Sequence, residues 1–263
     1  ERVPYHRELA AVPLADDGLF RVDGRAGLSH GNSGTLIGLQ DIRGISPLRL
    51  NTLEQYMTHL PDYRLFQLVN VKYVFTDWQQ LEIPSTIVAS DTEAHPPLFV
   101  HEIDDPVPRT WMVYRVMVAA DEAQALGWMA NPSFDPRSTV ILTHDPEIDL
   151  PAEPPERAAV NIVSYAPERI VIGVRSPADG VLILSEMDYP GWYAEIDGRQ
   201  VPIWRADAGL RAVAVEAGTH EVVFTFRPAA LAIGMTISLL SATVITGGLL
   251  LGQKVAISHG SEA

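Results

Sequence analysis

The sequence predicts an α+β fold: a mixed α/β domain over residues 1–150, a β-sandwich domain over 158–227, a transmembrane helix over 228–252 and a short tail over 253–263. Three observations lead to this prediction. Strand-like and helix-like apolar patterns alternate in the first part of the chain. Short β-type runs then follow one another at nearly regular spacing. The chain closes on a long segment that contains no charge.

The composition excludes several classes of protein. The 263 residues include no Cys, which removes thiol nucleophiles, iron–sulfur clusters and Cys-zinc sites, and the eight His lack metal-ligand spacing. We therefore expect no metal and no cofactor. The 19 Lys and Arg stand against 33 Asp and Glu, and the only lysines are Lys72 and Lys254. Because phosphate binding needs a concentrated basic face, no nucleic-acid partner is expected.

The first domain mixes strand and helix periodicities. The helix predicted over 121–130 is the best marked, because Asp121 can cap it, Glu122 favours its positive end, and Asn131-Pro132 stops it. This helix lies between two strand-like runs, so we expect a βαβ unit. The strand-like runs are 71–77, 98–103, 110–119 and 139–144, and the other helical patterns are 50–60 and 62–69.

A Pro-rich, acidic stretch over 144–157 reads as the boundary before the second domain. Beyond it, the succession of short β-type runs is typical of a β-sandwich. Asp197-Gly198 suits a tight hairpin and Pro190-Gly191 a type II turn, because both need positive φ angles. The predicted strands are 159–165, 169–176, 180–187, 192–196, 201–206, 210–215 and 220–226.

The end of the chain predicts a membrane span. Residues 229–252 are 24 residues without a charge, and ~20 apolar residues suffice to cross a bilayer as a helix. A buried core helix is the alternative. The sequence begins with neither an initiator Met nor a signal peptide. We therefore expect either a tail-anchored cytosolic protein or the C-terminal piece of a longer polypeptide whose earlier membrane helices direct the topology.

The segment 185–215 combines aromatic rings with charged side chains. Aromatic faces beside carboxylate and guanidinium groups suit a sugar, because the rings take its apolar C–H face and the charged groups take its hydroxyls. The alternative is structural: the two Trp side chains fill the sandwich core, and Arg205 pairs with Asp207 or Asp188. The candidate carbohydrate-binding residues are Asp188, Tyr189, Trp192, Trp204, Arg205 and Asp207.

Two pairs of carboxylates stand two residues apart on strand-like runs, Glu102 with Asp104 and Glu186 with Asp188. This spacing puts each pair on one strand face, where it either serves acid–base catalysis or, more commonly, lines a solvated face. No nucleophile elbow, serine–lysine motif or dinucleotide-binding fingerprint accompanies them. The sequence therefore assigns no catalytic residue.

Residues 184–228, LSEMDYPGWYAEIDGRQVPIWRADAGLRAVAVEAGTHEVVFTFRP, run straight into the charge-free segment. This stretch closely resembles the C-terminal end of the YfhO-like family of bacterial multi-span membrane proteins. Other stretches resemble the same family in the same order and together cover most of the chain. They are LIGLQDIRGISPLRL (36–50), VNVKYVFTD (69–77), VHEIDDPVPRTWMVYRV (100–116) and FDPRSTVIL (134–142).

The resemblance implies a GT-C-type glycosyltransferase of the bacterial cell membrane. In such a protein a bundle of membrane helices takes a sugar from a polyprenyl-phosphate carrier and transfers it to an envelope polymer, lipoteichoic acid being the one usually associated with the family. The present region would be a large extracytoplasmic domain followed by the last membrane helix, and it would position an acceptor or cap the bundle. Its partners would be the bilayer, the sugar donor, the envelope glycopolymer and the N-terminal membrane helices.

One departure from the family limits what can be carried over. GT-C-type catalysis is expected to use acidic residues in early extracytoplasmic loops, and this chain has a single predicted span and none of those loops. No catalytic residue is therefore assigned by the resemblance. The competing hypothesis is a non-catalytic, membrane-anchored module that binds envelope carbohydrate or a partner protein.

Overall fold

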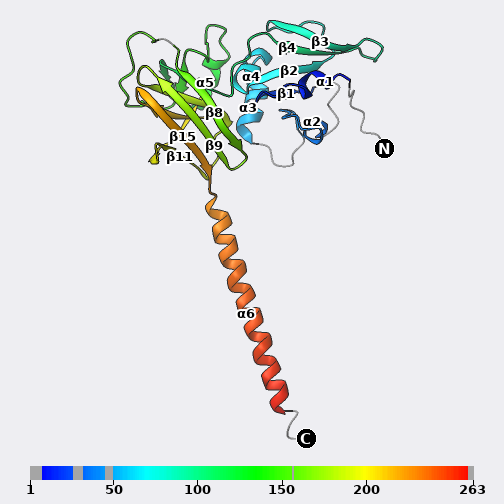
Figure 1. Ribbon diagram of the computed structural model, residues 1–263, viewed down its shortest axis with the longest axis vertical. Helices are drawn as coiled ribbons and strands as arrows, with labels where there is room; N and C mark the ends of the chain where they lie inside the picture. Colours follow the sequence, from blue (N-terminus) through cyan, green and yellow to red (C-terminus); the bar gives the residue numbers. More distant parts are fainter. Residues whose placement is uncertain (1–7, 26–31, 45–49, 156, 260–263) are drawn as a thin grey trace.

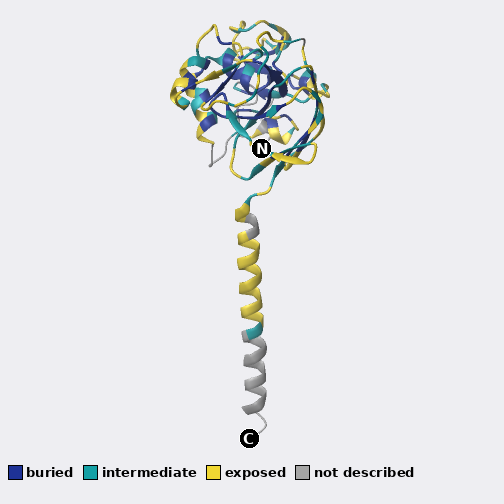
Figure 2. Ribbon diagram, turned by 90° about the vertical axis from the view of Figure 1, so that its left-hand side faces the viewer, coloured by how far each residue is buried: buried dark blue, intermediate teal, exposed yellow. Residues whose placement is uncertain are grey.

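The computed structural model describes residues 8–25, 32–44, 50–155 and 157–259, without the side chains of 33, 231–232 and 248–259. The chain is an α+β protein dominated by strands, which form one five-stranded, two four-stranded and one two-stranded sheet in the described part. A long C-terminal helix projects from the strand-rich body (Figure 1). Figure 2 shows that buried residues gather in the body and exposed ones along the described part of the helix.

The first sheet has the order β1-β2-β4-β3, with β1 parallel to β2 and the other pairs antiparallel. Strand β3 was not predicted, because its side chains are partly or fully exposed and show no apolar alternation. The helices predicted over 50–60 and 62–69 are present as α3 and α4. The bounds are α1 Ala11–Leu14, β1 Arg21–Asp23, α2 Ser33–Leu36, α3 Asn51–His59, α4 Asp62–Leu68, β2 Val71–Thr76, β3 Ser85–Asp91 and β4 Leu98–Ile103.

The expected βαβ unit is confirmed. Strands β6 (Val116–Val118) and β7 (Val140–Leu142) pair in parallel, and α5 (Glu122–Met129) connects them. The Asp121 carboxylate accepts a hydrogen bond from the Gln124 amide at 2.8 Å and so caps the helix as predicted.

Two antiparallel sheets face each other around a common apolar core. The four-stranded sheet has the order β13-β14-β10-β5 and the five-stranded sheet β12-β11-β15-β9-β8. Most of these strands begin and end within one or two residues of the predicted bounds. They are β5 Thr110–Val113, β8 Ala159–Ala166, β9 Arg169–Ser176, β10 Gly180–Met187, β11 Trp192–Ile196, β12 Arg199–Val201, β13 Trp204–Ala206, β14 Leu210–Val215 and β15 Gly218–Phe226.

Strand β10 is buried on both faces. Leu182 and Leu184 belong to the core between the two sheets, whereas Val181 and Ile183 pack into the core formed with α3, α4 and α5. Its neighbours are β14 and β5, and β5 comes from the stretch predicted as the first domain. The two predicted domains therefore share a sheet.

Two predicted strands are divided in the structure. The run over 201–206 was predicted as one strand, which is wrong, because β12 and β13 lie in different sheets with Pro202 between them. Proline has no amide hydrogen to donate and fixes its own φ angle, which suits a strand break. The run over 110–119 is likewise divided, since β5 pairs with β10 and β6 with β7.

The predicted turns have the expected backbone geometry. Asp197 and Gly198 have φ angles of 51° and 77° between β11 and β12, as a tight hairpin requires. Gly191 has a φ angle of 108°, in the range that its predicted turn needs. The first turn joins β11 to β12, and the turn at Gly191 leads from the end of β10 to the start of β11.

The C-terminal helix α6 (Ala229–His259) follows β15 after a two-residue connection. It contains the segment predicted to span a membrane, and its described apolar side chains, such as Ile237 and Leu239, are exposed. Among the residues that the structure describes, no helix is found that is long and apolar enough to cross a membrane.

The shared strand predicts that the body unfolds in one step. Leu182→Ala and Ile183→Ala remove apolar contacts on opposite faces of β10, and each is expected to cost about 2–5 kcal/mol of stability. Both should lower the midpoint of a single thermal transition followed by near-UV circular dichroism. Val163→Ala, at an exposed position on β8, is the control and should change the stability by less than about 0.5 kcal/mol. Two separate transitions would show that the halves fold independently.

Candidate functional site

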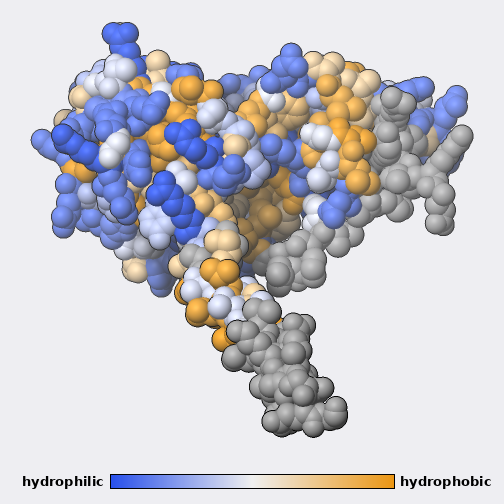
Figure 3. Space-filling view, turned by 60° about the horizontal axis from the view of Figure 1, so that its bottom comes forward, coloured by the Kyte–Doolittle hydropathy of each residue, from blue (hydrophilic) through white to orange (hydrophobic). Residues whose placement is uncertain are grey.

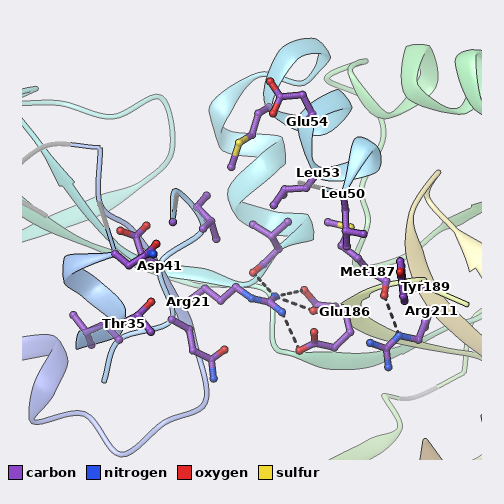
Figure 4. A pocket seen from close by; sticks show the side chains of 18 of the residues that line it. Arg21, Thr35, Asp41, Leu50, Leu53, Glu54, Glu186, Met187, Tyr189 and Arg211 are labelled. Atoms are coloured by element: carbon purple, nitrogen blue, oxygen red, sulfur yellow. Dashed lines mark hydrogen bonds and ion pairs between the residues drawn. The ribbon is translucent and has the colours of Figure 1, made fainter. Parts of the chain in front are cut away.

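A cavity of about 810 Å³ lies between the first sheet, the start of α3 and the end of β10. Figure 3 shows an apolar hollow beside the first turns of α6, and Figure 4 shows the side chains that line the cavity. Tyr189 and Trp192 line it, and their ring centroids lie 6.4 and 5.3 Å from that of Phe226, the last residue of β15. The cavity therefore adjoins the connection to the C-terminal helix.

A β-bulge at the end of β10 supplies the polar wall. Leu184 pairs with Arg211, but Met187 pairs with Leu210, so Ser185 and Glu186 have no opposite residue on β14. A bulge of this kind re-aims the side chains that follow the regular part of a strand. It brings Glu186 out of the apolar alternation of β10 and into the lining of the cavity.

Glu186 is the centre of a buried charge network. Its carboxylate oxygen Oε1 lies 2.9 Å from a guanidinium nitrogen of Arg21 and 2.9 Å from one of Arg109, and it accepts the Tyr165 hydroxyl at 2.5 Å. Burial by itself raises the pKa of Glu186, but the two guanidinium charges and the hydroxyl outweigh it, and the net pKa is lowered. Burial, with the neighbouring Glu186 charge, raises the pKa of Tyr165 to about 12.

The same network joins three segments of the chain. Arg109 donates to the Asn70 side chain at 2.9 Å, and Asn70 in turn donates to the Val107 carbonyl at 2.7 Å. Arg21 donates to the carbonyls of Val69 and Ser185 at 2.9 and 2.8 Å. The network thus links β1 and the end of α4 to β10, and it holds the walls of the cavity together.

Arg211 forms the side of the cavity that carries Trp192. Its guanidinium lies 3.7 Å from the centroid of the Trp192 ring, and its Nε donates to the Met187 carbonyl at 3.2 Å. Burial lowers the pKa of Arg211 to about 10, which leaves it charged at neutral pH.

The six predicted carbohydrate-binding residues fall into two groups. Asp188, Tyr189 and Trp192 lie at the cavity: the last two line it, and Asp188 is close enough for its charge to act on Arg211. The face of Trp192 under Arg211 is covered, whereas Tyr189 is 49% exposed. Tyr189 is therefore the aromatic residue of this group that is open to a ligand.

The other three predicted residues hold the β13–β14 turn to the helices. Trp204 packs edge-on against His144 with 5.5 Å between ring centroids. Arg205 donates to the Thr52 hydroxyl at 2.6 Å and pairs with Glu122 at 3.0 Å. None of the three lines the cavity at the base of α6. The partners of the structural alternative were wrong, because Arg205 pairs with Glu122 and Trp204 packs against the core that includes the helices, not the sandwich core.

Asp207 is a fully buried carboxyl in this turn. It accepts a hydrogen bond from the Ile141 amide at 2.8 Å through Oδ1, whereas Oδ2 has no hydrogen-bond partner. The Tyr56 hydroxyl donates to its backbone carbonyl. Burial raises the pKa of Asp207 to about 7, because the Ile141 amide and the more distant Arg64 charge offset only part of the desolvation.

The sequence analysis did not predict Arg21, Arg109 or Arg211 as residues of the site. It named Glu186 only as one member of a carboxylate pair. Arg211 stands inside the apolar strand run LRAVAV, where a buried charge demands a partner. That is the one local signal that could have marked it. The two carboxylates of the other pair have unrelated neighbours, since Glu102 faces Lys72 and Asp104 accepts from Thr86.

Asp207→Asn should change the pH dependence of stability. A carboxyl whose pKa is raised by folding stabilises the folded state most at pH values below its unfolded pKa of ~3.9. This stabilisation is lost as the pH rises toward about 7. The free energy of unfolding of the variant, relative to that of the unchanged protein, should therefore rise as the pH is raised from ~4 to about 7 and level off above that pH. The rise should be at most about 1.4 kcal/mol per pH unit.

Asp77→Asn is the matched control, because it makes the same chemical change at an exposed carboxyl directly after β2. It should show no such gain toward alkaline pH in thermal or denaturant unfolding. Parallel pH profiles for Asp207→Asn and the unchanged protein would mean that Asp207 is not buried in this way.

The comparisons with known proteins bear on the second half of the chain. Residues 155–238 match the family model described as bacterial membrane protein YfhO. No curated protein and no solved structure matches the chain. The matched region includes β10, β11 and β14, and with them Glu186, Tyr189, Trp192 and Arg211. The match confirms, for residues 155–238, the resemblance to the YfhO family of bacterial membrane proteins that was drawn from the sequence.

Proposed function

We propose that the chain is the extracytoplasmic C-terminal part of a membrane glycosyltransferase of the GT-C type. The whole protein would move a sugar from a polyprenyl-phosphate carrier to an envelope polymer. The family match supports a membrane protein, and the observation that carries the role of this region is the cavity at the base of α6. A cavity in that position is suited to hold an acceptor close to the membrane surface.

The cavity has the chemistry of a carbohydrate site. Tyr189 offers an exposed ring on which the apolar face of a sugar can stack, and Trp192 supports it from within the wall. Asp188 supplies an acceptor for hydroxyl groups next to the ring. The role of the cavity is to bind and position the acceptor, since no residue of this chain is assigned to the transfer step.

Helix α6 supports the membrane placement. Its described side chains include exposed Ile, Leu, Met and Val residues, and residues 229–252 contain no charge. Water is a poor solvent for such a surface, whereas the hydrocarbon core of a bilayer is a good one. We propose that α6 spans the membrane and that the strand-rich body lies outside it.

A non-catalytic module that binds envelope carbohydrate is the second candidate. It needs the same cavity and the same helix. The two candidates differ in whether glycan transfer depends on the cavity, so one set of variants separates them.

Tyr189→Ala in the full-length membrane protein should weaken use of the acceptor. Loss of one stacking ring, about 0.5–1.5 kcal/mol, corresponds to a rise in the KM for the acceptor of about 2- to 10-fold, with kcat changed less. The measurement is transfer of labelled sugar from a polyprenyl-phosphate donor in membrane vesicles.

Tyr193→Ala is the matched control, because Tyr193 is similarly exposed at 43% but lies outside the cavity lining. Unchanged transfer in both variants, with carbohydrate binding reduced in Tyr189→Ala alone, would favour the non-catalytic module. Equal effects of the two substitutions would show that the cavity does not bind the acceptor.

The placement of the body can be tested in intact cells. Protease added to spheroplasts should cut the body, and alkaline carbonate should leave the full chain in the membrane pellet. Deleting residues 229–252 should release the body into the soluble fraction, because the apolar segment is lost. A deleted chain that still pellets, or a body protected in intact spheroplasts, would contradict this placement.

A further inference from the structure

The guanidinium of Arg211 is buried in the cavity wall with an incomplete set of partners. The residue is only 3% exposed, its Nε donates to the Met187 carbonyl, and its Nη1 has no hydrogen-bond partner. A buried charged donor without a partner is costly, so such groups are normally paired. Figure 4 shows Arg211 directed toward the middle of the cavity. Arg211 also lines the cavity, so part of its guanidinium borders the space that a ligand would enter, while Nη1 itself is enclosed.

The nearby carboxylates do not satisfy this donor. Glu186 already pairs with Arg21 and Arg109 and accepts a hydrogen bond from the Tyr165 hydroxyl. Asp188 acts on Arg211 only through its charge. Neither carboxylate is hydrogen-bonded to Arg211 in the part of the chain that the structure describes. An anion placed beside Arg211 would give its guanidinium the partner that these carboxylates do not supply.

The rest of the same wall is apolar. Leu50, Leu53, Met57 and Met187 line the cavity, and Figure 4 places Leu50 and Met187 on the side of Arg211. Of the acidic lining residues, Asp41 lies toward the opposite side in that view, and Glu54 lies at the top, on α3 above Leu50 and Leu53. A volume of about 810 Å³ can hold a headgroup and part of a hydrocarbon chain. The arrangement suits an amphiphile with an anionic head.

The position of the cavity indicates that the amphiphile comes from the membrane. Trp192, stacked on Arg211, lies beside Phe226 at the end of β15, just before α6 begins. With α6 in the membrane, which is part of the proposed function, the cavity opens at the bilayer surface. A lipid can then reach it without leaving the membrane plane.

We propose that this cavity binds one anionic glycerophospholipid of the surrounding bilayer. Its phosphate pairs with Arg211, and its acyl chain lies along the wall formed by Leu50, Leu53, Met57 and Met187. The bound lipid fixes the body against the membrane surface and completes the wall beside Tyr189.

Lipid selectivity of the detergent-solubilised full chain tests the site. Native mass spectrometry should detect one phosphatidylglycerol bound with at least tenfold preference over phosphatidylcholine. Arg211→Met should weaken phosphatidylglycerol binding about tenfold or more, because a charge-assisted contact is lost. The control Arg137→Met removes an arginine that pairs with Asp105 outside the cavity, and it should bind phosphatidylglycerol like the unchanged chain.

A second pair of variants keeps Arg211 in place. Leu50→Glu adds a carboxylate to the partly exposed rim of the cavity and should abolish the preference for phosphatidylglycerol, whereas Leu50→Gln should keep it. This pair decides the question if Arg211→Met does not fold, as judged by circular dichroism.

Three results would overturn the site: equal binding of the two lipids, phosphatidylglycerol binding unchanged in Arg211→Met or Leu50→Glu, or inorganic phosphate binding as tightly as the lipid. The last would assign the cavity to free phosphate. Carbonate extraction and protease accessibility report the membrane placement separately. A chain that passes those tests but shows no lipid selectivity loses this site alone.

Discussion

The double burial of β10 is the constraint around which the body is arranged. Its alternate side chains enter two different cores, so each face must be covered, one by the five-stranded sheet and the other by helices. Strand β5 closes one edge of β10 and β14 the other, with Leu182 opposite both Met112 and Val213. A slip of one residue in this register would exchange the two faces. The strand therefore fixes how the N-terminal and C-terminal halves of the body meet.

The site begins where that regular strand ends. The bulge after Leu184 releases Glu186 from the apolar alternation, and the carboxylate then collects Arg21, Arg109 and Tyr165 from three distant parts of the sequence. A buried carboxylate is tolerated only when it is paired, which explains why the walls of the cavity converge on this residue. Strand β10 is thus held by apolar packing before the bulge and by charge pairing after it.

The aromatic and charged residues of the segment 185–215 serve two different ends of the body. Tyr189 and Trp192 lie at the cavity beside α6, while Trp204, Arg205 and Asp207 fasten the β13–β14 turn to α3, α5 and β7. Pro202 separates the groups by ending β12 before β13 joins the other sheet. Proximity in the sequence thus predicted a single candidate site, whereas in the structure these residues divide between the cavity beside α6 and the β13–β14 turn.

Local pattern was sufficient for most of the elements. Apolar alternation, the Asp121 cap and the glycine-containing turns each express a preference that acts over a few residues, so the bounds of α5 and of most C-terminal strands follow from the sequence. The exposed strand β3 was not predicted, because it has no apolar alternation. The strand break at Pro202 was not predicted either, because it depends on which sheet each half joins. The charged half of the site could not be predicted, since Arg21, Arg109 and Glu186 stand far apart along the chain and no short-range pattern links them. The sequence by itself determined α3, α4, α5, most of the C-terminal strands, two turns and the family resemblance. Only the tertiary structure decided which charges share a buried space, because the pairing of a buried charge depends on long-range chain contacts.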